Sequence, residues 1–580
     1  MSNYWDKLSN ERKKLQEDNL LPEWFTTAGW QLFKDRYLWA ETPRKQYETI
    51  AATLAAHTDD APKWKDKFFN LLWSGWLSPS TPVLANTGTT RGLPVSCSGG
   101  YVQDSIDGFY SSRHEAALLT KHGFGTSGYL GDIRPRGTAI SSGGKASGVI
   151  PVLQGFVQDS RDVSQGGVRR GSWAGYLPID HGDFWEVVGH LEKEPDDLNI
   201  GWNISDAFMS KLNTSISKMD DTEAAEARKR FSTALKVKLV TGKGYFWFPD
   251  KANRKLPKYY PISNKASNLC SEILLPSDEQ HTYTCVLSSM NVAKYDEWKD
   301  TDAIFTATVF LDCVASEFIA RAKGIPGLEN AVRFTEKGRA LGLGVAGFHT
   351  YLQQNRIAID SLDAVYFNQE LFEKLNKESL EASRWMGLEW GFAPWSVESW
   401  NTSHPGRESD PLADLVRNCS RIAIAPTKST ALIMGGISEG INPDPAMIYT
   451  QSTAGGEMAR INPIILEIMK DRGVYDKKHM QEVIDKFGSV QHVDWLDDEE
   501  KKVFRTAFEI DQNVLVRLAS QRGKYLDQWQ SVNLFFSAEE DPKYIVDVHK
   551  TAFNDENIIG LYYIYSKSGV SGSKDCEVCS

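Results

Sequence analysis

The sequence predicts an α/β barrel preceded by a helical N-terminal lobe and followed by a flexible C-terminal tail. Three patterns support this prediction. Residues 1–77 read as helices, residues 78–540 alternate short apolar segments with helical patterns, and residues 566–580 are rich in Ser and Gly. The length of 580 residues does not by itself fix the number of domains, because large α/β barrels also reach this size.

In the N-terminal lobe, residues 47–56 give the clearest helical run. The lobe is also rich in tryptophan, whose large apolar surface anchors packing. The expected anchors are Trp24, Trp30, Trp39, Trp64 and Trp73.

Within residues 78–540, short apolar runs rich in β-branched and aromatic residues are candidate strands, and longer periodic runs are candidate helices. This alternation is typical of an α/β barrel. The candidate strands are residues 149–153, 236–240, 245–248, 422–425 and 432–434.

Residues 541–565 form a separate C-terminal segment, which begins as a helix and carries the consecutive pair Tyr562 and Tyr563. Such pairs are mostly packing features. The tail, residues 566–580, carries Cys576 and Cys579. A zinc site needs four ligands, and no second Cys or His pair lies near them. A thioredoxin-type motif opens a helix, whereas this sequence ends one residue after Cys579.

Composition excludes several classes of protein. A net charge of −11 argues against polynucleotide binding, although clusters such as Arg134 with Arg136, or Arg169 with Arg170, suit the phosphates of single nucleotides. We find no signal peptide and no window near the ~20 apolar residues of a membrane helix, so we expect a cytoplasmic protein with no membrane partner. Seven cysteines in a reducing compartment are thiols, not a disulfide framework.

Asn268, Cys270 and Glu272 lie two residues apart, in the run Ser-Asn-Leu-Cys-Ser-Glu-Ile. If the segment is extended, an amide, a thiol and a carboxyl share one face at about 6–7 Å spacing. The alternative is a half-exposed strand with a buried cysteine. Two more cysteines lie in motif-like settings, Cys97 in Val-Ser-Cys-Ser-Gly-Gly-Tyr and Cys285 in Tyr-Thr-Cys-Val-Leu.

These motifs resemble the catalytic large subunit of ribonucleotide reductase, over nearly the whole chain from about Ser78. Further matching segments are Ser-Pro-Ser-Thr-Pro-Val-Leu-Ala-Asn from Ser78, Gly-Gly-Lys-Ala-Ser-Gly from Gly143, Gln-Gly-Gly-Val-Arg-Arg-Gly from Gln165, Leu-Gly-Leu-Gly-Val-Ala-Gly-Phe from Leu341, Ala-Pro-Thr-Lys-Ser-Thr from Ala425, Asp-Gln-Trp-Gln-Ser-Val-Asn from Asp527 and Leu-Tyr-Tyr from Leu561.

The resemblance implies a ten-stranded barrel of two half-barrels, with the Cys270 loop running through its interior. It implies that a Cys270 thiyl takes the 3′ hydrogen of a ribonucleotide, that Glu272 is the general base and that Asn268 holds the sugar. Cys97 and Cys285 would be the reducing pair, which requires their Cα atoms to approach within about 7 Å. For Cys313 and Cys419 we expect inert buried thiols.

The resemblance also implies partners. Cys576 and Cys579 would re-reduce the dithiol and pass the oxidation to thioredoxin or glutaredoxin. Tyr563 and then Tyr562 would relay the radical from a metal-containing small (beta) subunit to Cys270, which favours class I over the cobalamin-dependent class II. We expect no metal and no cofactor bound in this chain itself, and a homodimer.

Nucleotide sites follow from the same resemblance. The substrate site is assigned to Thr81, Ser96, Gly123, Asn268, Pro426, Thr427, Lys428, Ser429 and Thr430, although a turn or helix cap is the alternative for any Ser/Thr cluster. A nucleoside triphosphate effector is assigned to Asp104, Ser105, Ile106, Arg134 and Arg169, with the loop of residues 165–171 signalling to the substrate site. Arg134 could equally form a surface salt bridge. Because the barrel motifs begin at Ser78, we expect no N-terminal ATP-cone.

Three rival functions are weaker. Gly342, Gly344 and Gly347 match G-x-G-x-x-G, which is typical of an NAD-dependent dehydrogenase. The residues before them are polar, however, and we expect these glycines to let a helix pack closely. A glycyl-radical enzyme would carry a glycine radical near the C-terminus, where this chain has Tyr-Tyr and Cys-x-x-Cys. Retention of all three cysteines and of Glu272 argues against a non-catalytic scaffold homologue.

Overall fold

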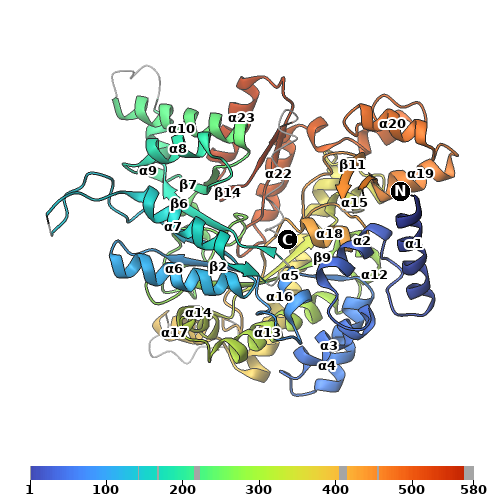
Figure 1. Cartoon of the computed structure of the whole chain (residues 1–580), viewed down its shortest axis with the longest axis horizontal. Helices are drawn as coiled ribbons and strands as arrows, with labels where there is room; N and C mark the ends of the chain where they lie inside the picture. Colours follow the sequence, from blue (N-terminus) through green and yellow to red (C-terminus); the bar gives the residue numbers. More distant parts are fainter. Residues whose placement is uncertain are drawn as a thin grey trace.

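The computed structural model describes residues 2–141, 143–165, 169–214, 222–403, 414–453 and 456–566. The N-terminal region is helical, as predicted, and lies beside the sheet-containing body of the protein (Figure 1). Three of its helices start at capping residues, since Thr26 accepts a hydrogen bond from the Gly29 amide, Thr42 from the Lys45 amide and Asp60 from the Lys63 amide. Its helices are α1 (Ser2–Glu17), α2 (Thr27–Leu32), the π-helix η1 (Phe33–Tyr37), α3 (Pro43–Ala55) and α4 (Ala61–Trp73).

The main sheet connects nine strands in the described part of the chain. Five consecutive neighbours, β2, β3, β6, β7 and β8, run parallel, and β9 joins them antiparallel to β2. The order is β1 (Leu77–Pro79), β9 (Tyr283–Asn291), β2 (Cys97–Tyr101), β3 (Gly125–Tyr129), β6 (Trp173–Pro178), β7 (Asn199–Asn203), β8 (Tyr245–Trp247) and β14 (Gly560–Leu561), with β10 (Leu341–Ala346) paired to β9.

Beyond β10 the sheet continues through irregular segments. The amides of Leu341 and Leu343 donate to the carbonyls of Ser420 and Arg421, and the Ile424 amide donates to the Trp529 carbonyl. These segments curl the sheet toward the C-terminal residues, which confirms the predicted α/β fold with a helical N-terminal lobe. In the described residues the sheet has nine regular strands where the resemblance implied ten, because the segments around Ser420 and Trp529 contribute only scattered backbone bonds and one isolated bridge, between Ile424 and Gln530.

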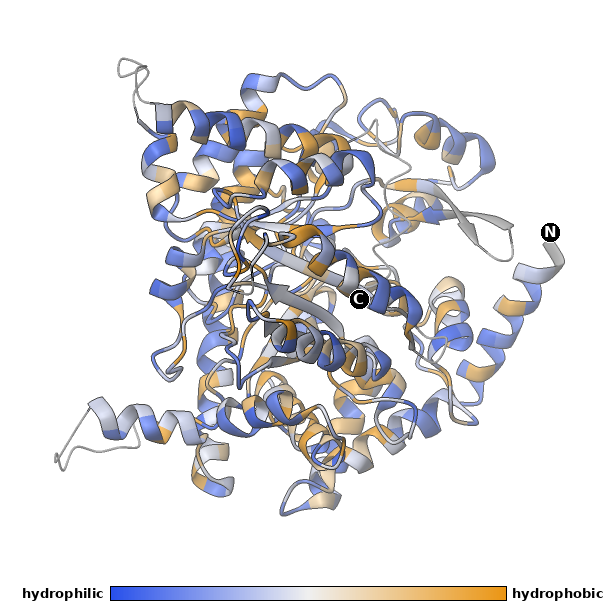
Figure 2. Cartoon of the chain, turned by 60° about the vertical axis from the view of Figure 1, so that its left-hand side comes forward, coloured by the Kyte–Doolittle hydropathy of each residue, from blue (hydrophilic) through white to orange (hydrophobic). Residues whose placement is uncertain are grey.

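Helices cover the sheet, and hydrophilic residues colour much of the outer ribbon (Figure 2). The buried residues of these helices are mostly apolar. The covering helices include α6 (Ile106–Lys121), α7 (Val149–Asp162), α8 (Phe184–Lys193), α10 (Thr222–Thr241), α13 (Ala303–Ala322), α14 (Glu329–Gly338), α16 (Leu362–Trp390), α22 (Gln512–Gly523) and α23 (Pro542–Asn554).

Shorter elements connect these layers. They are α5 (Thr81–Asn86), β4 (Ser164–Gln165), β5 (Arg169–Arg170), α9 (Asp206–Leu212), α11 (Pro249–Lys255), η3 (Val292–Lys294), α12 (Tyr295–Trp298), α15 (Phe348–Gln354), α17 (Pro394–Ser403), α18 (Lys428–Ile433), β11 (Ile448–Thr453), β12 (Gly456–Ile461), α19 (Pro463–Asp471), α20 (Lys477–Asp485), α21 (Asp498–Val503), η5 (Ala507–Glu509), β13 (Leu534–Phe536) and β15 (Ile564–Ser566).

Three of the five candidate strands are wrong. Residues 149–153 begin α7, residues 236–240 lie in α10, and residues 432–434 end α18. A short apolar run cannot separate a strand from the buried face of a helix. Residues 245–248 coincide with β8, while residues 422–425 contribute an isolated bridge at Ile424 in place of a regular strand.

Helix α13 corrects the expectation that no segment approaches a membrane span. Its 20 residues are long and apolar enough by length and composition, but 72% of its apolar window is buried inside the protein. It also carries Asp312, whose carboxylate bonds to the guanidinium groups of Arg339 and Arg417 at 2.8 Å each. This helix therefore has the burial of a core helix.

Candidate active site

Two of the predicted cysteines face each other across a strand pair. Cys97 on β2 and Cys285 on β9 are direct partners in the antiparallel register. Opposite residues of antiparallel strands have Cα atoms about 4.5–5.5 Å apart, which falls within the range of disulfides. Both residues are thiols in this structure. The pair can therefore close into a disulfide without a rearrangement of the sheet.

The segment from Asn268 to Glu272 is not extended, so the expected single strand face is wrong. Leu269 and Cys270 form a turn, and Ser271 has a left-handed φ of 61°. The Asn268 side chain stabilises this turn, because its Oδ1 accepts the amides of Glu272 at 3.1 Å and of Ile273 at 3.3 Å. Local side-chain bonding of this kind competes with strand formation.

The turn brings the predicted polar groups together more closely than a strand would. Asn268 Nδ2 donates to Glu272 Oε1 at 2.9 Å and to Cys97 Sγ at 3.4 Å. Cys270 is 2% exposed and Glu272 0% exposed. One asparagine amide thus connects the predicted base to one thiol of the predicted reducing pair, in a site closed to bulk water.

A segment near the C-terminus, residues 527–531, forms the other wall of this site. Ser531 Oγ donates to the Cys270 carbonyl at 2.7 Å and lies 3.2 Å from Glu272 Oε2. The Trp529 amide donates to the Glu272 carbonyl at 2.9 Å. This segment therefore contacts both the thiol-bearing turn and the carboxylate.

Gln528 in the same segment contacts Cys285. Its Nε2 donates to Cys285 Sγ at 3.4 Å and to the Leu341 carbonyl at 2.7 Å, while its Oε1 accepts the Leu274 amide at 3.2 Å. Burial raises the pKa of Cys285, and the hydrogen bond from Gln528 partly opposes that rise. At neutral pH Cys285 is therefore a protonated thiol.

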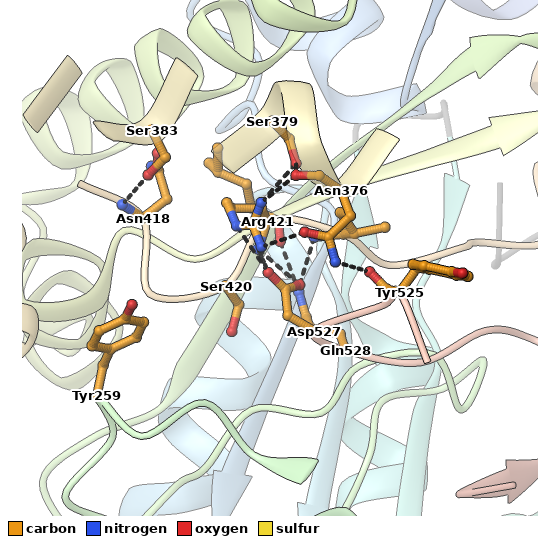
Figure 3. A network of polar contacts seen from close by, with 12 residues as sticks. Tyr259, Asn376, Ser379, Ser383, Asn418, Ser420, Arg421, Tyr525, Asp527 and Gln528 are labelled. Atoms are coloured by element: carbon orange, nitrogen blue, oxygen red, sulfur yellow. Dashed lines mark hydrogen bonds and ion pairs between the residues drawn. The ribbon is translucent and has the colours of Figure 1, made fainter. Parts of the chain in front are cut away.

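An ion-pair network holds this segment against the residues that continue the sheet (Figure 3). The Asp527 carboxylate accepts the amides of Arg421 and Ile422 at 2.7–3.0 Å and pairs with the Arg421 guanidinium at 3.1 Å. Arg421 in turn donates to the Asn376 carbonyl and to Ser379 Oγ on α16, both at 2.9 Å. The network therefore fixes the position of Asp527, the residue directly before Gln528.

The tyrosine pair lies at the edge of the same region. The rings of Tyr562 and Tyr563 are 4.1 Å apart and tilted by 55°, so they are in contact without stacking in parallel. Tyr245 on β8 contacts both rings, at 5.0 and 5.5 Å, and its hydroxyl donates to the Tyr563 hydroxyl at 3.3 Å. The Tyr562 amide donates to the Val532 carbonyl at 2.8 Å, one residue from Ser531.

Three of the residues assigned to the substrate lie in separate segments that precede strands β2 and β3. Ser96 directly precedes Cys97 and donates to Ser80 Oγ at 2.8 Å, and Thr81 Oγ1 lies 3.2 Å from the Tyr37 hydroxyl. Gly123 has a left-handed φ of 108°, which favours glycine.

The assigned phosphate segment, Pro426 to Thr430, follows Ile424, whose carbonyl accepts the Ser531 amide. Within it, Thr427 has a left-handed φ of 56° and its Oγ1 accepts the Gly440 amide at 2.9 Å. Lys428 and Ser429 are half-buried at the start of α18. The structure therefore brings this segment next to the wall that contacts Cys270.

The assigned effector residues gather at the start of α6. Arg134 Nε pairs with Asp104 Oδ2 at 2.5 Å, so the predicted salt bridge and the predicted nucleotide site involve the same residues. Ser105 caps α6 by accepting the Gly108 amide at 3.0 Å, and Ile106 is 70% exposed. The side chain of Arg169, and residues 166–168, lie outside the described part.

Two other expectations can be compared with the structure. Cys313 and Cys419 are buried, as expected. Gly342 and Gly344 lie in strand β10 and not in a helix, which corrects that interpretation. A Cβ on Gly342 would lie 2.3 Å from Leu287 Cδ2 and 2.9 Å from Cys285 Sγ, so the glycine permits close packing beside the dithiol. Cys576 and Cys579 lie outside the described residues.

Sequence reasoning did not assign roles to Gln528, Ser531 or Tyr245. For Gln528 and Ser531 the sequence did contain a signal, because both lie in the segment from Asp527, which is one of the motifs that resemble the family. Tyr245 carried no signal beyond its strand pattern.

The chain matches two family models. Residues 23–92 match the ribonucleotide reductase all-alpha domain, and residues 95–220 and 213–564 match the ribonucleotide reductase barrel domain.

Similar proteins agree with these matches. A putative ribonucleoside-diphosphate reductase large subunit of Frog virus 3 is 33% identical, covering 91% of this chain and 93% of that protein. The ribonucleoside-diphosphate reductase large subunit of Invertebrate iridescent virus 3 is 28% identical, covering 94% of both. The solved class Id ribonucleotide reductase alpha subunit of Actinobacillus ureae superposes with a TM-score of 0.82 at 33% identity, over 94% of this chain and 98% of that one.

Proposed function

The chain belongs to the ribonucleotide reductase large-subunit family, and on this basis we propose that it reduces ribonucleoside diphosphates at the site built by Cys270, Glu272, Asn268, Cys97 and Cys285. The observation that carries the proposal is the contact of one asparagine with both the Glu272 carboxylate and the Cys97 thiol. Through this contact the proposed general base, Glu272, and one thiol of the proposed reducing pair, Cys97, lie in a single buried site.

In the proposed reaction, a thiyl on Cys270 takes the 3′ hydrogen atom of the ribose and leaves a carbon radical. Glu272 accepts the 3′-hydroxyl proton, and a thiol of the pair protonates the departing 2′-hydroxyl, which leaves as water. The other thiol of the pair gives a hydrogen atom to the 2′ carbon, and Cys97 and Cys285 close a disulfide. The electron released in this closure, together with the proton held by Glu272, restores the 3′-hydroxyl and the radical at the 3′ carbon. Cys270 finally returns the hydrogen atom to the 3′ carbon and is a thiyl again.

Burial supports these roles. A thiyl exposed to solvent would be lost to side reactions, and exclusion of water strengthens the bond between Glu272 and Asn268. The protonated state of Cys285 suits a thiol that must give up hydrogen.

We place the origin of the radical in a separate metal-containing small subunit. Contact between Tyr563 and Tyr562, and the backbone bond from Tyr562 to Val532 beside the wall of the site, support a relay in the order Tyr563, Tyr562, Cys270. The similarity to a class I alpha subunit supports the same choice. We further propose that the protein is cytoplasmic.

We propose that Cys576 and Cys579 on the tail reduce the Cys97–Cys285 disulfide, and that thioredoxin or glutaredoxin then reduces the tail. The substrate phosphates are assigned to the segment Pro426 to Thr430.

A nucleoside triphosphate effector is assigned to Asp104, Ser105, Ile106, Arg134 and Arg169. The exposed start of α6 near these residues also supports assembly as a homodimer. We also propose that the chain divides into a helical lobe (residues 1–77), a barrel domain (78–540), a C-terminal segment (541–565) and a tail (566–580).

The test is formation of deoxynucleoside diphosphate with dithiothreitol as reductant, in three mixtures: the chain alone, the chain with candidate small subunits, and the chain with adenosylcobalamin. We expect activity only with a small subunit, and none in Cys270→Ser. Activity restored by adenosylcobalamin alone would replace the class I assignment with class II. Full activity of Cys270→Ser would remove the thiyl mechanism.

A further inference from the structure

The two thiols of the pair differ in access to solvent. Cys97 is 6% exposed, whereas Cys285 is 0% exposed. An external thiolate that reduces their disulfide must reach one sulfur, and the more accessible sulfur is Cys97 Sγ. The other sulfur, Cys285, must then leave as a thiolate in a buried position.

A buried thiolate is a poor leaving group, because burial opposes its charge and exchange slows as the pKa of the leaving thiol rises. A donor aimed at the sulfur lowers that barrier. Gln528 supplies one, since its Nε2 lies 3.4 Å from Cys285 Sγ.

The amide of Gln528 is fixed in this orientation by the backbone. One Nε2 hydrogen bonds to the Leu341 carbonyl on β10, and Oε1 accepts the Leu274 amide, which leaves the second Nε2 hydrogen for the sulfur. The ion pair between Arg421 and Asp527 anchors the preceding residue (Figure 3). Asn268 makes the corresponding bond to Cys97 at 3.4 Å, so each thiol accepts one side-chain amide.

We propose that Gln528 is a further catalytic residue, which stabilises the Cys285 thiolate as it leaves during re-reduction of the Cys97–Cys285 disulfide. A thiolate of the reductant bonds to Cys97 Sγ, the bond between the two protein sulfurs breaks, and its electron pair goes to Cys285, which then takes a proton. The second thiol of the reductant attacks the mixed disulfide and releases Cys97, so the reductant leaves as a disulfide. This inference rests on the dithiol of the proposed function.

The test follows the disulfide directly and needs neither nucleotide nor radical. The full chain is oxidised with diamide, the Cys97–Cys285 peptide pair is verified by mass spectrometry, and its disappearance is timed in excess dithiothreitol. Gln528→Met keeps the side-chain length and removes the donor. The control is Gln512→Met, because Gln512 on α22 is equally buried and, like Gln528, donates to backbone carbonyls and accepts a backbone amide, but its hydrogen bonds go to Ala507, Ile510 and Phe535 instead of a thiol.

We expect Gln528→Met to slow reduction about tenfold, which is the scale of one hydrogen bond to a charged group, while Gln512→Met stays within about twofold of the wild type. Equal rates for Gln528→Met and the wild type, or equal slowing in both variants, would overturn the proposal. If Gln528→Met does not fold, Gln528→Asn, whose shorter amide is drawn back from the sulfur, carries the same expectation. Failure of diamide to join Cys97 to Cys285 would instead count against the dithiol of the proposed function.

Discussion

The sharpest prediction concerns Asn268, because five hydrogen bonds of the active site end on its side chain. In Asn268→Ala, the amides of Glu272 and Ile273 lose their acceptor in a buried setting. Each unsatisfied group costs about 1–3 kcal/mol. The turn should therefore open locally, and the loss of the Nδ2 donor should also free the Glu272 carboxylate to reorient.

Hydrogen exchange measured on peptides that contain Glu272 and Ile273 reads out this effect. A cost of about 1–3 kcal/mol corresponds to a roughly 5- to 150-fold loss of protection at those two amides. Deoxynucleotide formation should fall to background in the same variant. Both effects follow from one side chain.

The matched control is Asn264→Ala. Asn264 is also buried and holds the same stretch of chain through the carbonyls of Ala266 and Leu275, but it accepts no amide from the turn. We expect its variant to lose stability while amides 272 and 273 keep most of their protection. Unchanged exchange at those amides in Asn268→Ala would refute our account of the turn.

Three further predictions address stability, packing and the radical relay. Burial raises the pKa of Asp312, but two adjacent guanidinium groups hold it at about 2, below the usual 3.8. About 2 kcal/mol of stability is therefore present above pH 4 and lost as pH falls through 2, and acid unfolding of Asp312→Asn should lack this dependence. Gly342→Ala should cost about 1–3 kcal/mol and displace Cys285, since its Cβ would lie 2.9 Å from Sγ, whereas Gly189→Ala, which meets nothing within 4 Å, should be neutral or stabilising in thermal unfolding. Tyr563→Phe should abolish turnover while nucleotide affinity, measured by calorimetry, stays unchanged; retained turnover would exclude this tyrosine from the relay.

Sequence patterns predicted the fold class well, because long helical periodicity and the alternation of strands and helices survive in the structure. They failed where short apolar runs belonged to helices, as at Val149, which begins α7. Periodicity within five residues does not distinguish the two structures.

The site was predicted by residue type and not by geometry. Cys97 and Cys285 meet because β2 and β9 pair, a long-range fact that spacing in the sequence cannot contain. The Asn268 turn was misread as extended because its conformation depends on bonds from its own side chain. Gln528 acquires its contact only when the C-terminal segment folds back onto β9 and β10.

The central claim is that one buried site couples deoxynucleotide formation to oxidation of two specific thiols. The most direct measurement is an anaerobic single turnover with the small subunit, in which product is counted against the Cys97–Cys285 disulfide by peptide mass mapping. The chain used is pre-reduced and carries Cys576→Ser and Cys579→Ser, so that the tail cannot take over the disulfide. We predict one Cys97–Cys285 disulfide per deoxynucleotide in this variant, and neither species when Cys270→Ser is added. Product without that disulfide, or a disulfide that forms equally without nucleotide, would contradict the account.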